Sequence, residues 1–120
     1  MNGVSVYGKS LVTILACALV LAMIAIPLIL RKIPRNGAYG FRTAKTLSSD
    51  EIWYDVNSYF GRAFLIANVA TVVFMILLYQ FQQDLPLDYF MKLSIATLVA
   101  PSILAVIMTF LRVRSISKKP

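Results

Sequence analysis

The feature that most constrains the fold is a set of three uncharged apolar runs, each long enough to cross a lipid bilayer. A helix needs roughly 20 apolar residues to span the hydrocarbon core, and runs of this kind occur at 11–30, 63–81 and 93–111. Inside lipid every backbone N–H and C=O must be paired within the protein, so such segments are expected to be helical. We therefore predict an all-α membrane protein with three transmembrane helices in one membrane domain, residues 1–120.

The distribution of charge indicates what surrounds these runs. The chain is 59% hydrophobic and has a net charge of +7. In a water-soluble protein such a positive charge favours nucleic-acid binding, because Lys and Arg neutralise phosphates. Here the cations flank the apolar runs instead of covering one face. We therefore expect a bilayer with anionic headgroups as the partner, and no direct contact with nucleic acid.

The same charges predict an orientation. The segment 31–62 carries six Lys and Arg residues, and the tail 112–120 carries four with no acid. The connection between the second and third runs has only Lys92, against Asp84 and Asp88. Short loops rich in Lys and Arg stay in the cytoplasm, which places the N-terminus outside and the C-terminus inside. The first run precedes its basic cluster, so it is predicted to be a retained anchor and not a cleaved signal.

The second half of the long loop has the pattern of an amphipathic helix that precedes the second span. Ser48 and Glu51 match a capping box. An apolar stripe follows at helical spacing, formed by Ile52, Trp53, Val56, Tyr59 and Phe60. We expect this helix to lie in the cytoplasmic headgroup region, with Trp53 as an interfacial anchor. Gly61 and Arg62 follow, and the sequence leaves open whether the two helices are continuous or bend there.

The first half of the loop has turn chemistry. Pro34 is expected to end or kink the first helix, and Asn36-Gly37 is a turn dipeptide because both residues tolerate positive φ. Gly40 adds a second permissive point. Asn57, on the side of the helix that Trp53 occupies, is predicted to hydrogen-bond the turn backbone. Arg42 is expected to contact a lipid, a partner or one of three nearby carboxylates, those of Asp50, Glu51 and Asp55.

A spaced set of residues in this loop resembles the SdpI family of small bacterial membrane proteins. The set consists of Asn36, Tyr39, Gly40, Arg42, Thr43, Thr46, Leu47, Ser48, Trp53, Asn57 and Gly61. The resemblance covers roughly residues 26–73, and the three-span layout extends it over most of the chain. We expect the chain to be a short form that carries the shared region without the additional spans of longer members.

The resemblance implies a location and a function. The location is the bacterial cytoplasmic (inner) membrane, as a multi-pass protein. The founding member of the family is thought to protect its producer from a membrane-active peptide toxin and to relay the toxin's presence by drawing a transcriptional repressor to the membrane. The expected function is therefore immunity or signalling, with a peptide toxin or a cytoplasmic regulator as the partner. The motif residues other than Leu47 and Ser48 are the candidates for partner binding.

Catalysis is not expected from these residues. The sequence has no histidine, which removes the commonest general base and metal ligand. The single cysteine, Cys17, lies within the first apolar run and is expected to be a small packing residue. The acids on the predicted cytoplasmic side do not form paired metal ligands. We therefore predict a non-enzymatic protein with no catalytic, cofactor-binding or metal-binding residues.

One alternative function remains open, that of a small transporter or channel subunit. Asn68 is the most polar group deep in a span, and Pro101 should bend the third span. Together they suggest a polar path, although an interhelical hydrogen bond is the expected role for Asn68. Three short helices bury little surface, so a homo-oligomer is also expected.

Overall fold

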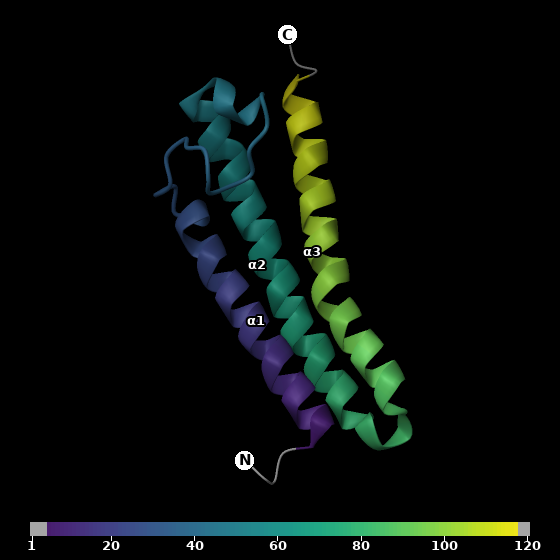
Figure 1. Cartoon of the computed structure of the whole chain (residues 1–120). Helices are drawn as coiled ribbons and strands as arrows, with labels where there is room; N and C mark the ends of the chain where they lie inside the picture. The colour runs from purple at the N-terminus through teal and green to yellow at the C-terminus, as the bar shows by residue number, and fades with distance from the viewer. Residues whose placement is uncertain (1–4, 118–120) are drawn as a thin grey trace.

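The computed structural model describes residues 5–117 and contains three long helices arranged side by side (Figure 1). These are α1 (Val6–Ile29), α2 (Asp50–Gln80) and α3 (Leu87–Ser117), with short 3₁₀ turns η1 (Thr46–Ser48) and η2 (Gln82–Asp84) in the two connections. The described part of the chain contains no β-strand. All three helices are long and apolar enough to cross a membrane. The predicted all-α, three-span architecture is therefore confirmed.

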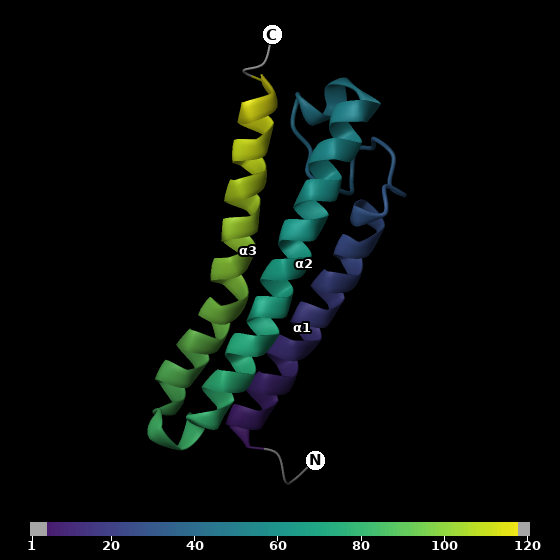
Figure 2. The same ribbon diagram turned by 180° about the vertical axis from the view of Figure 1, so that it is seen from behind.

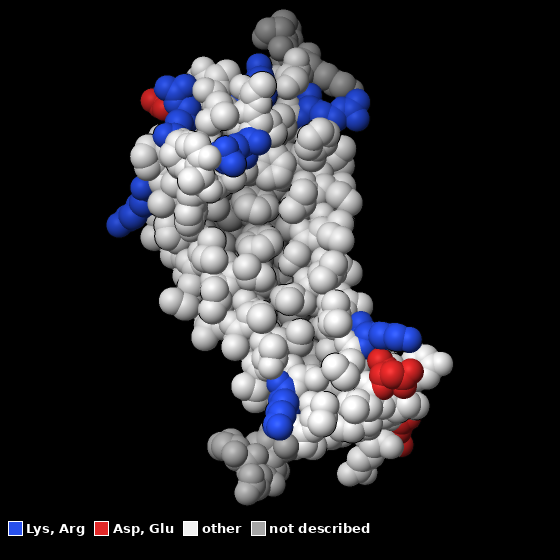
Figure 3. All heavy atoms as spheres, in the orientation of Figure 1, with Lys and Arg blue, Asp and Glu red and all other residues white. Residues whose placement is uncertain are grey.

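The helices run alternately up and down, with α2 between the other two (Figures 1 and 2). The bundle measures 57 × 27 × 19 Å, longer than a hydrocarbon core of about 30 Å. Its ends therefore project beyond the core, and these ends carry the charged side chains (Figure 3). Lys118 and Lys119 of the predicted basic tail lie outside the described residues.

The segment predicted as an amphipathic helix before the second span is the first part of α2, which continues through Gly61 and Arg62 without a break. The open question about this junction is thereby answered. The buried face of the segment also differs from the predicted apolar stripe. It contains Trp53 and Val56, but also Asn57, because the Asn57 amide pairs the backbone of the loop at Phe41. Ser58, which lies outside the predicted stripe, is buried as well.

Helix α1 ends before Pro34, the residue predicted to end or kink it. The N–H of Arg31 donates to the carbonyl of Leu28, and the N–H of Lys32 donates to that of Pro27. Arg31 has a φ of 58°. This pattern is a Schellman motif, in which a left-handed residue pairs the last free carbonyls of a helix. The terminating signal is therefore local backbone pairing ahead of the proline.

At the other end of the bundle, where α1 begins, Tyr7 makes both a hydrogen bond and an aromatic contact. The Tyr7 hydroxyl donates to the Leu85 carbonyl at 2.8 Å, and the Tyr7 and Phe90 rings meet edge to face with centroids 4.8 Å apart. Ile14 and Met75 complete a buried cluster with Phe90. These contacts join the start of α1 to the connection between α2 and α3.

A proline explains the polar link in the middle of the bundle. Pro101 has no N–H, so the carbonyl of Thr97, four residues earlier, loses its helical partner. The Thr71 hydroxyl of α2 lies 2.7 Å from this carbonyl and donates to it. Thr71 is fully buried. The proline expected to bend α3 thus also leaves a carbonyl free, and Thr71 of α2 pairs it across the two helices.

We expect Thr71→Val to lower the stability of the bundle by about 1 kcal/mol, the usual scale of a hydrogen bond between membrane helices. The same substitution should cost less in a Pro101→Ala background, because the new N–H can pair the Thr97 carbonyl within α3. Reversible denaturation in mixed detergent micelles measures both values. Equal losses in the two backgrounds would show that the freed carbonyl is not the reason for the Thr71 contact.

Candidate functional site: a loop closed over one end of the bundle

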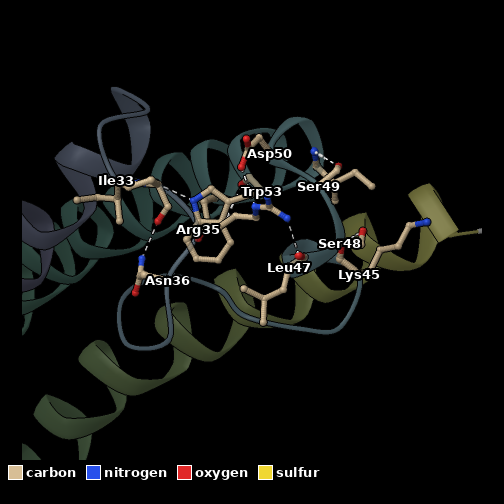
Figure 4. Close-up of polar contacts among 12 residues, drawn as sticks. Ile33, Arg35, Asn36, Lys45, Leu47, Ser48, Ser49, Asp50 and Trp53 are labelled. Carbon is tan, nitrogen blue, oxygen red and sulfur yellow. Dashed lines mark hydrogen bonds and ion pairs between the residues drawn. The ribbon is translucent and has the colours of Figure 1, made fainter.

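Residues 30–49, here called the cap loop, fold over the junction between the end of α1 and the start of α2 (Figures 1 and 4). Most residues of this loop are exposed or half-buried and only Thr46 among them is buried, but the backbone N–H and C=O groups that the loop turns toward the helices still need partners. Side chains of the predicted motif supply many of them. The site is therefore best described by which side chain pairs which part of the loop.

Asn36 organizes the first turn of the cap loop through its side chain. Its Oδ1 atom accepts from the N–H groups of Ala38 and Tyr39, at 2.8 and 2.6 Å. Its Nδ2 atom donates to the carbonyls of Pro34 and Tyr39, at 2.7 and 3.1 Å. Among the described residues, only Arg31 and Gly40 have positive φ. The predicted turn at Asn36-Gly37 is thus formed by an Asx-type side-chain contact and not by positive φ.

Trp53 lies beneath the loop and is fully buried. Its Nε1–H donates to the carbonyl of Ile33 at 2.7 Å (Figure 4). A buried indole usually finds such a partner. The prediction that Trp53 is an anchor in the headgroup region is therefore wrong, because the protein's own loop covers the ring.

Asn57 holds the middle of the cap loop, as the sequence predicts. Its Oδ1 atom accepts from the N–H of Phe41 at 2.6 Å, and its Nδ2 atom donates to the carbonyls of Phe41 and Trp53 at 3.3 and 3.0 Å. The side chain is buried. It replaces the strand or helix partner that the backbone at Phe41 lacks.

Gly40 is required where the loop passes over these two side chains. Its φ is +117°, in a region that side chains rarely adopt. A Cβ atom there would lie 2.7 Å from Asn57 Oδ1 and 3.0 Å from the Trp53 ring. Both the backbone conformation and the space therefore select glycine.

Thr43 and Thr46 close the last turn of the loop by reciprocal contacts. The N–H of Thr43 donates to Thr46 Oγ1 at 2.7 Å, and the N–H of Thr46 donates to Thr43 Oγ1 at 3.1 Å. The Thr46 hydroxyl also donates to the Thr43 carbonyl. Thr46 is fully buried. These contacts shape η1, which leads directly into α2.

The N-cap of α2 is Ser49 and not the predicted Ser48. Ser49 has extended backbone angles, and its hydroxyl accepts from the N–H of Ile52 at 3.2 Å (Figure 4). Ser48 belongs to η1, and its hydroxyl donates to the carbonyl of Lys45. The predicted capping box with Glu51 is therefore wrong, since the preceding 3₁₀ turn uses Ser48.

Arg35, and not Arg42, makes the ion pair that ties the loop to α2. Its Nε atom lies 2.7 Å from Asp50 Oδ1, and its Nη1 atom donates to the Leu47 carbonyl at 3.0 Å (Figure 4). The second ion pair within residues 5–117 joins Arg112 to Asp55 at 2.9 Å. Arg42 takes part in neither and is exposed. Of the contacts expected for Arg42, the ion pair with a loop acid is therefore not formed, and contact with a lipid or a partner stays a prediction.

Two further motif residues connect this end to α1. The Tyr39 hydroxyl donates to the Ile24 carbonyl, and burial raises the pKa of this hydroxyl, which keeps it a donor. A Cβ atom on Gly61 would lie 2.8 Å from Ile29 Cγ1 and 3.0 Å from the Ala25 carbonyl. Glycine thus permits the close approach of α1 and α2.

Asn68 does not make the predicted interhelical hydrogen bond. Its Nδ2 atom donates to the Phe64 carbonyl of its own helix at 2.8 Å. The side chain is 1% exposed, and its Oδ1 atom has no partner among the described residues. Thr71 makes an interhelical hydrogen bond instead, to the Thr97 carbonyl. The sequence signal for it is Pro101, which identifies this carbonyl as the one without a helical partner.

The inward use of these side chains limits what the site can do. Four motif side chains use their hydrogen-bonding groups to pair the loop backbone: Asn36, Thr46, Trp53 and Asn57. The described residues contain no group of three or more acidic, Cys or His residues able to hold a metal ion. Exposed side chains at this end include the charged Arg31, Lys32, Arg35, Arg42, Asp50 and Glu51 and the apolar Leu30 and Leu47. The arrangement is therefore a compact, predominantly basic surface, suited to contact with a partner.

We expect Gly40→Ala to destabilise the cap loop by roughly 1–3 kcal/mol, because it combines backbone strain with a clash. Gly37→Ala is the matched control, since a Cβ atom there would meet nothing within 4 Å. Limited proteolysis of the protein in micelles, with amide hydrogen exchange of residues 36–46, measures the opening of the loop. Equal protection in the two variants would contradict the described path of the loop.

The fluorescence of Trp53, the single tryptophan of the chain, reports on its burial. We expect blue-shifted emission and weak quenching both by aqueous acrylamide and by lipids brominated near the headgroup. An interfacial ring would be quenched strongly by such lipids. Asn57→Ala should increase both kinds of quenching, because it releases the loop that covers the ring. Strong lipid quenching in the unaltered protein would restore the interfacial-anchor interpretation.

Comparison with known proteins identifies the family. No curated protein and no solved structure matches the chain. The SdpI/YfhL protein family matches residues 32–112, a region that includes the cap loop after its first two residues, α2, and most of α3. Since this match covers well over half of the sequence, the chain belongs to the SdpI/YfhL family.

Proposed function

We propose that the protein is a non-enzymatic membrane protein that recognises a membrane-active peptide toxin, or relays its presence, through the outer face of the cap loop. Membership of the SdpI/YfhL family supports a membrane protein of this kind. The observation that carries the proposal is that some motif side chains pair the loop from inside whereas others are exposed on its surface. The amide, indole and threonine groups of the motif close the loop from inside, whereas Arg42 and Leu47 are exposed on it.

We infer that this end of the bundle lies in the cytoplasm. The cations of the cap loop, Arg62 and the C-terminal end of α3 lie at the same end (Figure 3). Loops with such an excess of Lys and Arg are retained on the cytoplasmic side. In this orientation the outer face of the cap loop meets the cytoplasm and the adjacent headgroup region, where we expect it to contact a cytoplasmic regulator or a toxin that has entered the membrane.

The proposal predicts two distinct classes of defect in a protection assay. A toxin-sensitive bacterial host that expresses the protein should survive challenge by at least one member of a panel of secreted membrane-active peptides. Asn57→Ala should abolish survival and increase proteolysis of the loop. Arg42→Gln should lower survival at least several-fold while leaving the loop as protected as before, because Arg42 supports no contact within the loop.

Lys9→Gln provides the matched control, since Lys9 is an exposed cation near the opposite end of α1 and should not affect survival. If Arg42→Gln and Lys9→Gln behave alike, the outer face of the cap loop is not the recognition surface. If no peptide of the panel is resisted by the unaltered protein at verified expression, the immunity function itself fails.

A further inference from the structure

A long apolar groove lies between α2 and α3, with a volume of about 770 Å³. Its walls combine large side chains with small ones that let the groove deepen, including Ala63, Ala67 and Ala70 on α2 and Ala96, Ala100 and Pro101 on α3. It extends from Ala63 on α2 to Phe81, the C-cap residue that follows α2, about 27 Å at 1.5 Å per residue. The groove therefore runs through most of the thickness of a hydrocarbon core.

Arginines stand where the groove reaches the basic end of the bundle. Arg62 immediately precedes Ala63 and lies one helical turn from Ile66, another residue of the wall. Arg112 lies one turn beyond Met108 on the opposite wall. Each wall therefore continues into a guanidinium group at this end.

The position of Arg112 is fixed by α2. Its Nη2 atom lies 2.9 Å from Asp55 Oδ1, and its guanidinium carbon lies 5.5 Å from the centre of the Tyr59 ring. Arg62 and Arg114 are exposed and take part in neither ion pair of the described residues. The single acid at this position leaves the mouth of the groove with a net positive charge.

The other end of the groove has a different character. One turn before Leu93, the last wall residue of α3 there, is Tyr89, with the Lys92 ammonium 5.7 Å from the ring centre. Asp84 and Asp88 lie close by in sequence, within η2 and the start of α3. One lysine and two aspartates give these residues a net negative charge, so an anionic group is favoured at the basic mouth alone.

From this asymmetry we propose that the groove binds one anionic phospholipid, with an acyl chain between α2 and α3 and the phosphate beside Arg62 and Arg112. An arginine is suited to a phosphate because its planar fork can donate two parallel hydrogen bonds. A second copy of the chain fits the same groove less well. Every copy inserts in the same orientation, so its own basic end would face this basic mouth.

Native mass spectrometry of the full-length protein released from micelles tests the proposal. The protein is incubated with equal amounts of phosphatidylglycerol and phosphatidylcholine that have identical acyl chains. We expect one retained lipid per chain, with roughly a fivefold preference for phosphatidylglycerol. Both lipids carry the phosphate, but the choline of phosphatidylcholine cancels its charge, so only phosphatidylglycerol gains the attraction of about 1 kcal/mol for one nearby cation. Arg62→Gln should remove this preference. Arg42→Gln, which removes an exposed cation of the same end outside the groove, should leave it unchanged.

A second pair of variants tests the acyl-chain site. Ala100→Phe fills the groove at an exposed wall position and should lower retention of both lipids several-fold, whereas Val99→Phe changes an exposed neighbour outside the wall and should not. Ala96→Phe, at another exposed wall position, replaces Ala100→Phe if helix content by circular dichroism shows that the latter misfolds.

Three results would overturn the lipid site. Equal retention of the two lipids by the unaltered protein would remove the charge argument. If Arg62→Gln and Arg42→Gln lower the preference for phosphatidylglycerol equally, the preference arises from the general attraction of a basic surface and not from the groove. A lipid-free dimer that Ala100→Phe converts to a monomer would show that a second copy fills the groove. A preference lost in Arg62→Gln alone, together with retention lost in the groove-filled variant, supports it.

Discussion

The hydrogen bonds between the Asn57 amide and the backbone at Phe41 are the interaction on which this end of the molecule depends. Twenty residues pass from one membrane helix to the next without forming a strand, so their polar backbone cannot be paired by a sheet. Asn57 pairs the backbone N–H and C=O of Phe41, and its Oδ1 atom occupies the space that a Cβ atom on Gly40 would need. Trp53 then holds the carbonyl of Ile33, on the other limb of the loop. One amide on α2 thus determines the path of both limbs.

The three membrane-spanning helices could be predicted because they depend on the summed hydropathy of consecutive residues. Length and apolarity identify each span, and the three runs were sufficient to predict three helices. Asn57 was also predictable, since a buried amide close in sequence to Trp53 and near a turn has few other roles. Trp53 was not, because helical periodicity shows which face is apolar but not whether lipid or protein covers it. The path of the loop decides that question, and no periodicity describes a loop.

Sequence patterns do not determine the ion pairs and caps, because these depend on which of two similar or adjacent residues the folded chain brings to a partner. Arg35 and Arg42 have the same side chain and flank the same turn, yet only the bend set by Asn36 brings one of them to Asp50. Ser48 and Ser49 differ by one residue, and the choice between them follows from where η1 ends. Thr71 could have been found, because a proline in a helix leaves a known carbonyl unpaired. The groove required coordinates, since it depends on the spacing of two helices.

The unbroken course of α2 has a mechanical consequence. The same 31-residue helix begins beneath the cap loop at Asp50 and ends at Gln80. There, at the opposite end of the bundle, Tyr7 hydrogen-bonds the connection to α3. Without a proline or a kink to absorb a tilt, a helix of this kind behaves as a stiff rod. A force on its first turn would therefore pivot its far end in the opposite direction about the Gly61 and Ala25 crossing, much as a lever turns about its fulcrum.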